Sequence, residues 1–171
     1  MLSWLDLHAG TALWLVAAAA LGLLACAAAA LAQAAARRRR RMSATLCAAL
    51  HPIRSLGEAV RTLRDMVEQS DGRPGREALA TLHDGGLAQR LRDVRGLDVA
   101  GLPSARAIEA AYEAREAAAR LMLWLERPPG ADGDARLRIQ MIWKTLHDSA
   151  GNLERDILAL ESPKGSRRDQ F

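Results

Sequence analysis

The N-terminal part of the chain contains a long run of residues without a charged side chain. This run extends from Gly10 to Ala36, and its only clearly polar members are Thr11 and Gln33. At the helical rise of about 1.5 Å per residue, its 27 residues form a helix about 40 Å long. The hydrocarbon core of a bilayer is roughly 30 Å thick. The pattern therefore predicts a transmembrane helix over 10–36.

Five consecutive arginines, Arg37, Arg38, Arg39, Arg40 and Arg41, follow the apolar run directly. Such a cluster resists translocation, and the positive-inside rule places it in the cytoplasm. We expect residues 37–41 to act as a stop-transfer block and residues 1–9 to form a short extracytoplasmic N-terminus. The same arginines can attract anionic lipid at the membrane surface. The pattern predicts a single-pass protein of a bacterial inner membrane, with its N-terminus outside and its C-terminal domain in the cytoplasm.

A cleaved secretory signal is the competing interpretation of the apolar run, because Ala30-Leu31-Ala32 resembles a cleavage site. A signal peptide begins with a positive region and has a shorter apolar core. No Lys or Arg precedes the run here. Both differences favour an anchor.

Small residues recur every four positions within the predicted membrane helix, so they share one helix face. Such a stripe allows two transmembrane helices to approach closely, and it predicts helix association. Its members are Ala18, Gly22, Cys26 and Ala30.

From Met42 onward the apolar positions follow alternating steps of 4 and 3 residues. This heptad spacing is typical of a helix that packs in a bundle or pairs in a coiled coil. Pro52 is expected either to kink the helix or to begin a new one. The heptad positions are Met42, Leu46, Ala49, Ile53, Leu56, Val60, Leu63 and Val67, of which Ile53, Leu56, Val60, Leu63 and Val67 are candidates for helix association.

The remaining pattern predicts further helices separated by turns. A turn over 70–75 ends the heptad helix, two short helices over 76–82 and 87–94 flank Gly85-Gly86, and a loop covers 95–103. Ser104 is expected to cap a long helix that ends at Glu126. Its apolar seam consists of Ala107, Ala111, Ala114, Ala118, Leu121 and Leu125.

A final helix is expected to begin at a capping Asp134 and to extend to about Glu161. The sequence 162–171 is polar and is expected to be a disordered tail. We expect the aromatic residues Tyr112, Trp124 and Trp143 in the core, and the alternative is that they are binding hot spots. The inward positions of the final helix are Ile139, Ile142, Leu146, Leu153, Ile157 and Leu160.

These patterns together predict an all-α protein. It would consist of a single N-terminal transmembrane helix and a small cytoplasmic helical bundle over 42–161, which begins with the membrane-proximal heptad helix. No alternating run of β-branched residues indicates a strand.

Charge is distributed unevenly along the 171 residues. The chain has 24 basic and 20 acidic residues. Once the five consecutive arginines and Asp6 are set aside, residues 42–171 hold 19 of each sign and carry no net charge. A nucleic-acid-binding domain needs a basic face, so this balance argues against a nucleic-acid partner. The two cysteines, Cys26 and Cys47, are too few for a disulfide framework or a four-cysteine zinc site.

His83-Asp84 is the first candidate for chemistry. The stretch around this pair resembles the metal-binding signature of HD-domain phosphohydrolases, which are all-helical enzymes. His51, 32 residues before His83, and Asp148, 64 residues after Asp84, would complete the ligand set. The resemblance implies a divalent metal ion that activates water for phosphoester hydrolysis.

The sequence departs from that family at several positions. Pro52 follows the first histidine, and Gly85 stands where an apolar residue is usual. The heptad register places His51 on the outer face of its helix, and Asp148 is rotated away from inward-facing Leu146. The simpler alternative is a turn in which Asp84 and the two glycines end one helix and start the next.

His51 also belongs to a second candidate motif. The sequence His51-Pro52-Ile53-Arg54-Ser55 resembles the phosphoacceptor box of sensor histidine kinases, which implies phosphotransfer through the His51 ring. Pro52 replaces the acidic residue of that box, and no Gly-rich phosphate loop is present. The alternative is a surface histidine at a helix kink.

The pattern as a whole favours a scaffold, adaptor or accessory subunit that acts through protein contacts. An anchor, an uncharged helical domain and a heptad helix are features of such interaction modules. The expected partners are the membrane and either a second copy of the chain or another membrane protein subunit. We expect neither a catalytic site nor a bound cofactor.

Overall fold

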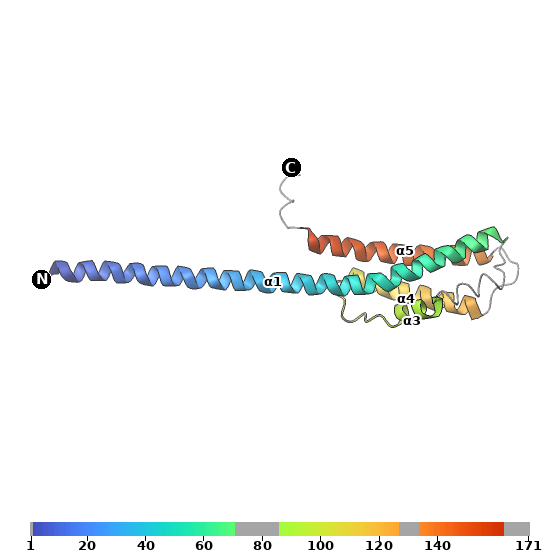
Figure 1. Cartoon of the computed structure of the whole chain (residues 1–171), viewed down its shortest axis with the longest axis horizontal. Helices are drawn as coiled ribbons and strands as arrows, with labels where there is room; N and C mark the ends of the chain where they lie inside the picture. Colours follow the sequence, from blue (N-terminus) through green and yellow to red (C-terminus); the bar gives the residue numbers. More distant parts are fainter. Residues whose placement is uncertain (1, 71–85, 127–133, 163–171) are drawn as a thin grey trace, which may run out of the picture. The chain divides into compact units, whose positions relative to one another are not determined.

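The computed structural model describes residues 2–70, 86–126 and 134–162. The chain divides into two units, Met1–Arg41 and Met42–Phe171. Helix α1 (Leu2–Gln69) begins in the first unit and ends in the second, and helices α3 (Leu87–Arg95), α4 (Ala105–Glu126) and α5 (Asp134–Glu161) belong to the second (Figure 1). None of the described residues lies in a strand, so the all-α prediction is confirmed for these ranges.

The first unit consists of one helix whose described side chains, from Trp14 to Arg41, are all exposed. Its described leucines are all exposed, and Leu21 and Leu31 are 67% and 72% exposed. A continuous apolar surface of this kind is unfavourable in water. By length and composition this part of α1 is a candidate membrane span.

The second half of α1 supplies leucine, isoleucine, valine and alanine side chains to the bundle core. Seven of the eight predicted heptad positions, from Leu46 to Val67, are buried, and the first, Met42, is half-buried, which confirms the register from Leu46 onward. The helix continues without interruption through Pro52, so the expectation that a new helix begins there is wrong. A proline removes one backbone donor, and the surrounding packing keeps the helix intact.

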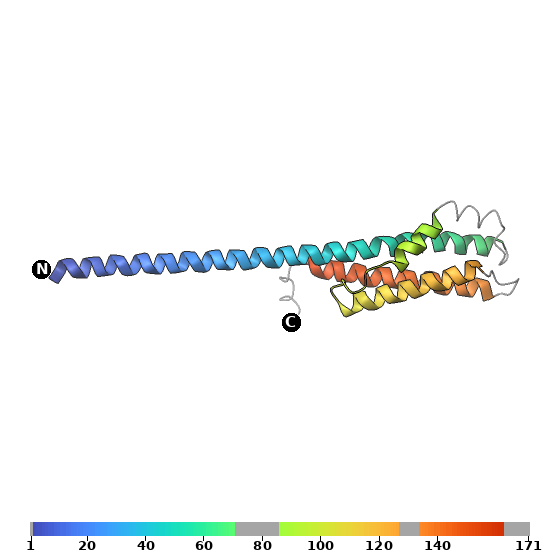
Figure 2. The ribbon, with the colours of Figure 1, turned by 90° about the horizontal axis from the view of Figure 1, so that it is seen from below.

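Helices α4 and α5 run antiparallel to each other, and both lie beside the second half of α1. Arg54 of α1 binds Glu154 of α5, and Ser104, just before α4, donates a hydrogen bond to Asp156 of α5. The short helix α3 lies against α1, where the Arg90 guanidinium donates a hydrogen bond to the Ser55 carbonyl at 3.2 Å (Figure 2).

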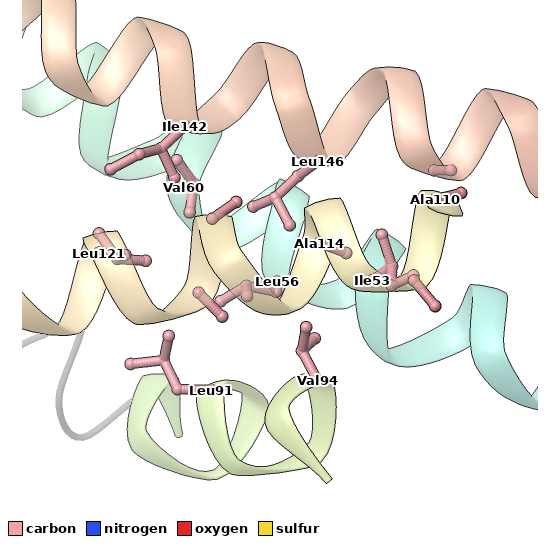
Figure 3. Packing of buried hydrophobic residues seen from close by; sticks show 14 of the residues in the cluster. Ile53, Leu56, Val60, Leu91, Val94, Ala110, Ala114, Leu121, Ile142 and Leu146 are labelled. Atoms are coloured by element: carbon pink, nitrogen blue, oxygen red, sulfur yellow. The ribbon is translucent and has the colours of Figure 1, made fainter. Parts of the chain in front are cut away.

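Side chains from all four helices meet in one core (Figure 3). Leu91 and Val94 of α3 point toward the same cluster as Leu56 of α1 and Leu146 of α5. Helix α3 therefore covers an apolar surface that the three long helices leave open.

Helix α4 is lined with alanine over a wider face than the sequence predicts. The predicted seam is buried except for Leu125, which is half-buried. Ala110, Ala117 and Trp124 are buried as well, because α4 has neighbours on two sides and not on one. Of the aromatic residues expected in the core, Trp124 is buried and Trp143 half-buried, whereas Tyr112 is 59% exposed and that expectation is wrong.

The ends of the helices follow local chemistry. The Ala107 N–H donates to the Ser104 side chain at 3.0 Å, which confirms Ser104 as the cap of α4. Gly86 precedes α3 with a φ of 78°, a conformation that glycine adopts without strain. The predicted helix over 76–82, the Asp134 side chain and residues 163–171 of the predicted tail lie outside the described residues.

Replacing Ala114 by leucine tests the close packing of α4. Ala114 is fully buried, so three added carbon atoms force the neighbouring helices apart, and we expect a loss of about 1–3 kcal/mol in the free energy of unfolding. Urea unfolding of the detergent-solubilised full chain, followed by tryptophan fluorescence, measures it. Ala105→Leu, on the exposed side of α4, is the matched control. Equal stability of the two variants would contradict close packing at Ala114.

Candidate interaction surfaces

The heptad residues predicted for helix association lie in the interior of the bundle. Ile53, Leu56, Val60, Leu63 and Val67 are each 0% exposed and pack against the chain's own helices. A partner's helix could contact them only if the bundle opened. Association of the folded chain therefore needs a different surface.

The predicted membrane-helix residues are accessible in their own unit. The small-residue stripe and the arginine block are exposed, and their members are Ala18, Gly22, Cys26, Ala30, Arg37, Arg38, Arg39, Arg40 and Arg41.

Of the four predicted metal ligands, the structure describes two, His51 and Asp148. His51 and Asp148 are both exposed, as their helical positions predict. His83 and Asp84 lie outside the described residues. Within the described ranges, no three histidine, cysteine, aspartate or glutamate residues come together as a metal site would require.

A polar groove of about 390 Å³ runs between α1 and α5. The Arg54–Glu154 ion pair bridges the two helices across it at 2.5 Å. Farther along, the Arg64 guanidinium lies 4.7 Å from the centre of the Trp143 ring, which stacks on His147 with 5.2 Å between ring centres. Both contacts are partly solvated and contribute modestly to stability.

Two glycines within helices line this groove, Gly57 of α1 and Gly151 of α5. An added Cβ at Gly57 would meet the Leu146 Cβ at 3.9 Å, an ordinary contact. An added Cβ at Gly151 would have no atom within 4 Å. Neither glycine is therefore required by close packing.

An apolar groove of about 560 Å³ lies between α4 and α5. Trp124 and Ile142, both buried, line it together with Leu123 and Met141, which are 64% and 62% exposed. Leu137, at 61% exposure, lies one helical turn before Met141 on the same face of α5. These five residues are called the α4–α5 patch below.

Trp124 adds a polar feature to the α4–α5 patch. Its indole N–H is buried and has no hydrogen-bond partner among the described residues. A buried donor without an acceptor costs stability, whereas the large apolar ring contributes to it. Sequence reasoning placed Trp124 in the core but did not reveal the patch, because Leu123, Leu137 and Met141 lie on two helices whose pairing the sequence does not specify.

Both basic and acidic side chains surround the α4–α5 patch. Arg120, Arg138 and Glu126 line the groove, and Arg120 also forms an ion pair with Glu116 at 2.6 Å. The rim is therefore neither uniformly basic nor uniformly acidic.

Comparison of the chain with protein-family models, curated proteins and solved structures found no match.

Alanine substitutions test whether the groove between α1 and α5 needs its glycines. Gly57→Ala and Gly151→Ala are each expected to raise the free energy of unfolding by about 0.5–1 kcal/mol, because alanine has the higher helix propensity and the space is available. Gly86→Ala is the contrasting control, expected to lower stability by about 1 kcal/mol because its φ is positive. Urea unfolding measures all three, and a loss at Gly151 would show a constraint on its backbone.

Proposed function

We propose that this protein is a membrane-anchored helical scaffold, adaptor or accessory subunit, which acts through protein–protein contacts. In this proposal the first half of α1 holds the chain in a bacterial inner membrane, with the N-terminus outside and the bundle in the cytoplasm. The small-residue stripe from Ala18 to Ala30 is available to another membrane helix, and the arginine block to anionic lipid.

The α4–α5 patch is the observation that carries the proposal. Large apolar side chains exposed next to one another, rimmed by charged groups, are typical of protein interaction surfaces. Leu123 and Met141 stand on either side of a groove that a partner's side chains can enter. Trp124, which is 5% exposed, forms the covered part of this groove.

The phosphohydrolase and phosphotransfer alternatives gain no support from the described residues. His51 is exposed and has no positioned acid or base described beside it. Nothing described therefore favours either chemistry over an interaction role.

Cysteine labelling tests the orientation of the anchor. Cys47 is exposed, and it follows the arginine block. In spheroplasts that express the full chain, a membrane-impermeant maleimide is expected to modify Cys47 only after permeabilisation, because the bundle is cytoplasmic. Cys47→Ala should abolish the labelling, since Cys26 lies within the apolar run. In the Cys47→Ala background, Ser3→Cys should react without permeabilisation. Labelling of Cys47 in intact spheroplasts would place the bundle outside.

Photocrosslinking tests whether the α4–α5 patch contacts protein. The photoreactive residue p-benzoylphenylalanine replaces Leu123 or Met141 in the full-length chain in its native membrane. Irradiation is expected to give adducts of discrete mass, because a docked partner lies within reach of both positions. Leu158, which is 61% exposed on α5 and does not line the groove, is the matched control and should give none. Absence of any protein adduct at positions 123 and 141 would refute the proposed interaction surface.

A further inference from the structure

We infer that the α4–α5 patch is the docking surface for a second copy of this chain, and that the two copies meet there through the same face. This inference rests on the proposed function, because it names the partner of the proposed surface. Three properties of the patch support it: its apolar groove, the antiparallel pairing of its two helices and the charges on its rim.

Each copy has both protruding apolar side chains and an apolar groove that can receive the side chains of the other copy. Leu123 and Met141 project from the walls, while Trp124 and Ile142 form the covered part. When two such faces meet about a twofold axis, each protruding side chain of one copy can enter the groove of the other. Closed symmetric dimers are built from self-complementary faces of this kind.

The helices of the patch suit the same arrangement. Helices α4 and α5 form an antiparallel pair, as the contacts of Ser104 and Arg106 with Asp156 show. Two antiparallel pairs placed face to face form a four-helix bundle, an arrangement that buries an apolar seam between four helices. The exposed side chains of the patch would occupy that seam.

The rim charges favour a copy of the chain over a strongly charged partner. Arg120 and Arg138 are accompanied on the rim by Glu126, and Glu116 adjoins Arg120. A rim that carries both signs can pair with itself, since each basic group of one copy can face an acidic group of the other. A uniformly acidic or basic partner would meet like charges, which disfavours the complex.

The size of the patch indicates why the anchor matters. A large aromatic side chain buries at most about 250 Å², and Leu123, Leu137 and Met141 are smaller and between 61% and 64% exposed. Together they present well under the roughly 800 Å² per partner that a stable soluble complex buries. The contact is therefore weak by itself. Anchoring both copies in one membrane raises their effective concentration and compensates for the small area.

Co-isolation of two differently tagged full-length chains from the same membrane tests the inference. Leu123→Arg or Met141→Arg in both copies is expected to reduce co-isolation by about tenfold, because a charge is then forced into the apolar contact. Leu158→Arg, an equally exposed leucine of α5 outside the groove, should leave co-isolation unchanged. Equal co-isolation of wild type and both patch variants would overturn the inference.

Cysteine crosslinking makes the result independent of any effect of arginine on folding. In a Cys26→Ala, Cys47→Ala background, Leu123→Cys or Met141→Cys is expected to form a covalent pair of chains in the membrane when a membrane-permeant bismaleimide is added, because each of its two maleimides adds one thiol. Leu158→Cys should remain a single chain. Failure of both patch cysteines to form the pair would refute the twofold contact.

The two experiments also separate this inference from the proposed function. A photoadduct at position 123 or 141 whose mass identifies a different protein, with no paired chain in the cysteine experiment, would overturn self-docking and leave the adaptor role supported. Absence of every protein adduct would overturn both.

Discussion

The close approach that alanine permits on α4 is the constraint on which the bundle depends. Ala107, Ala110, Ala111, Ala114 and Ala118 are all fully buried. A methyl side chain lets a neighbouring helix come near but removes little apolar area from water. The larger leucine, isoleucine and valine side chains of α1, α3 and α5 must therefore provide most of the apolar area that folding removes from water. They pack against the nearly flat alanine face of α4. This requirement explains why the core is assembled from all four described helices.

The narrow core also determines which apolar side chains of α4 and α5 stay exposed. Once the small face of α4 is turned inward, Leu123 lies on the opposite side of the same helix and stays exposed. Leu137 and Met141 of α5 are left outside for the same reason, because the buried face of α5 is already occupied by Ile139, Ile142 and Leu146. The α4–α5 patch is thus a consequence of how the two helices are oriented by the core. Leu123, Leu137 and Met141 of the patch lie outside the buried core, whereas Trp124 and Ile142 belong to it.

The two units of the chain differ in how far their described apolar side chains are buried. The second unit covers its own heptad, so the fully buried Ile53 and Val60 need no partner chain. In the first unit the described leucines, from Leu15 to Leu31, stay exposed, and this part of α1 is a candidate membrane span. The polar groove between α1 and α5, with Gly57 and Gly151, contributes no comparable apolar surface.

The sequence by itself determined most features that depend on neighbours along one helix, although it left open whether Pro52 begins a new helix. The heptad register, the cap at Ser104, the apolar run and the outer position of His51 follow from periodicity and local hydrogen bonding, and they agree with the structure. The tertiary structure decided which helices share a face. It turned the heptad helix into a core element, buried Ala110 and Ala117 beyond the predicted seam, exposed Tyr112 and brought Leu123 beside Met141. The physical reason is that periodicity specifies the direction of a side chain from its own helix, whereas burial depends on where other helices stand.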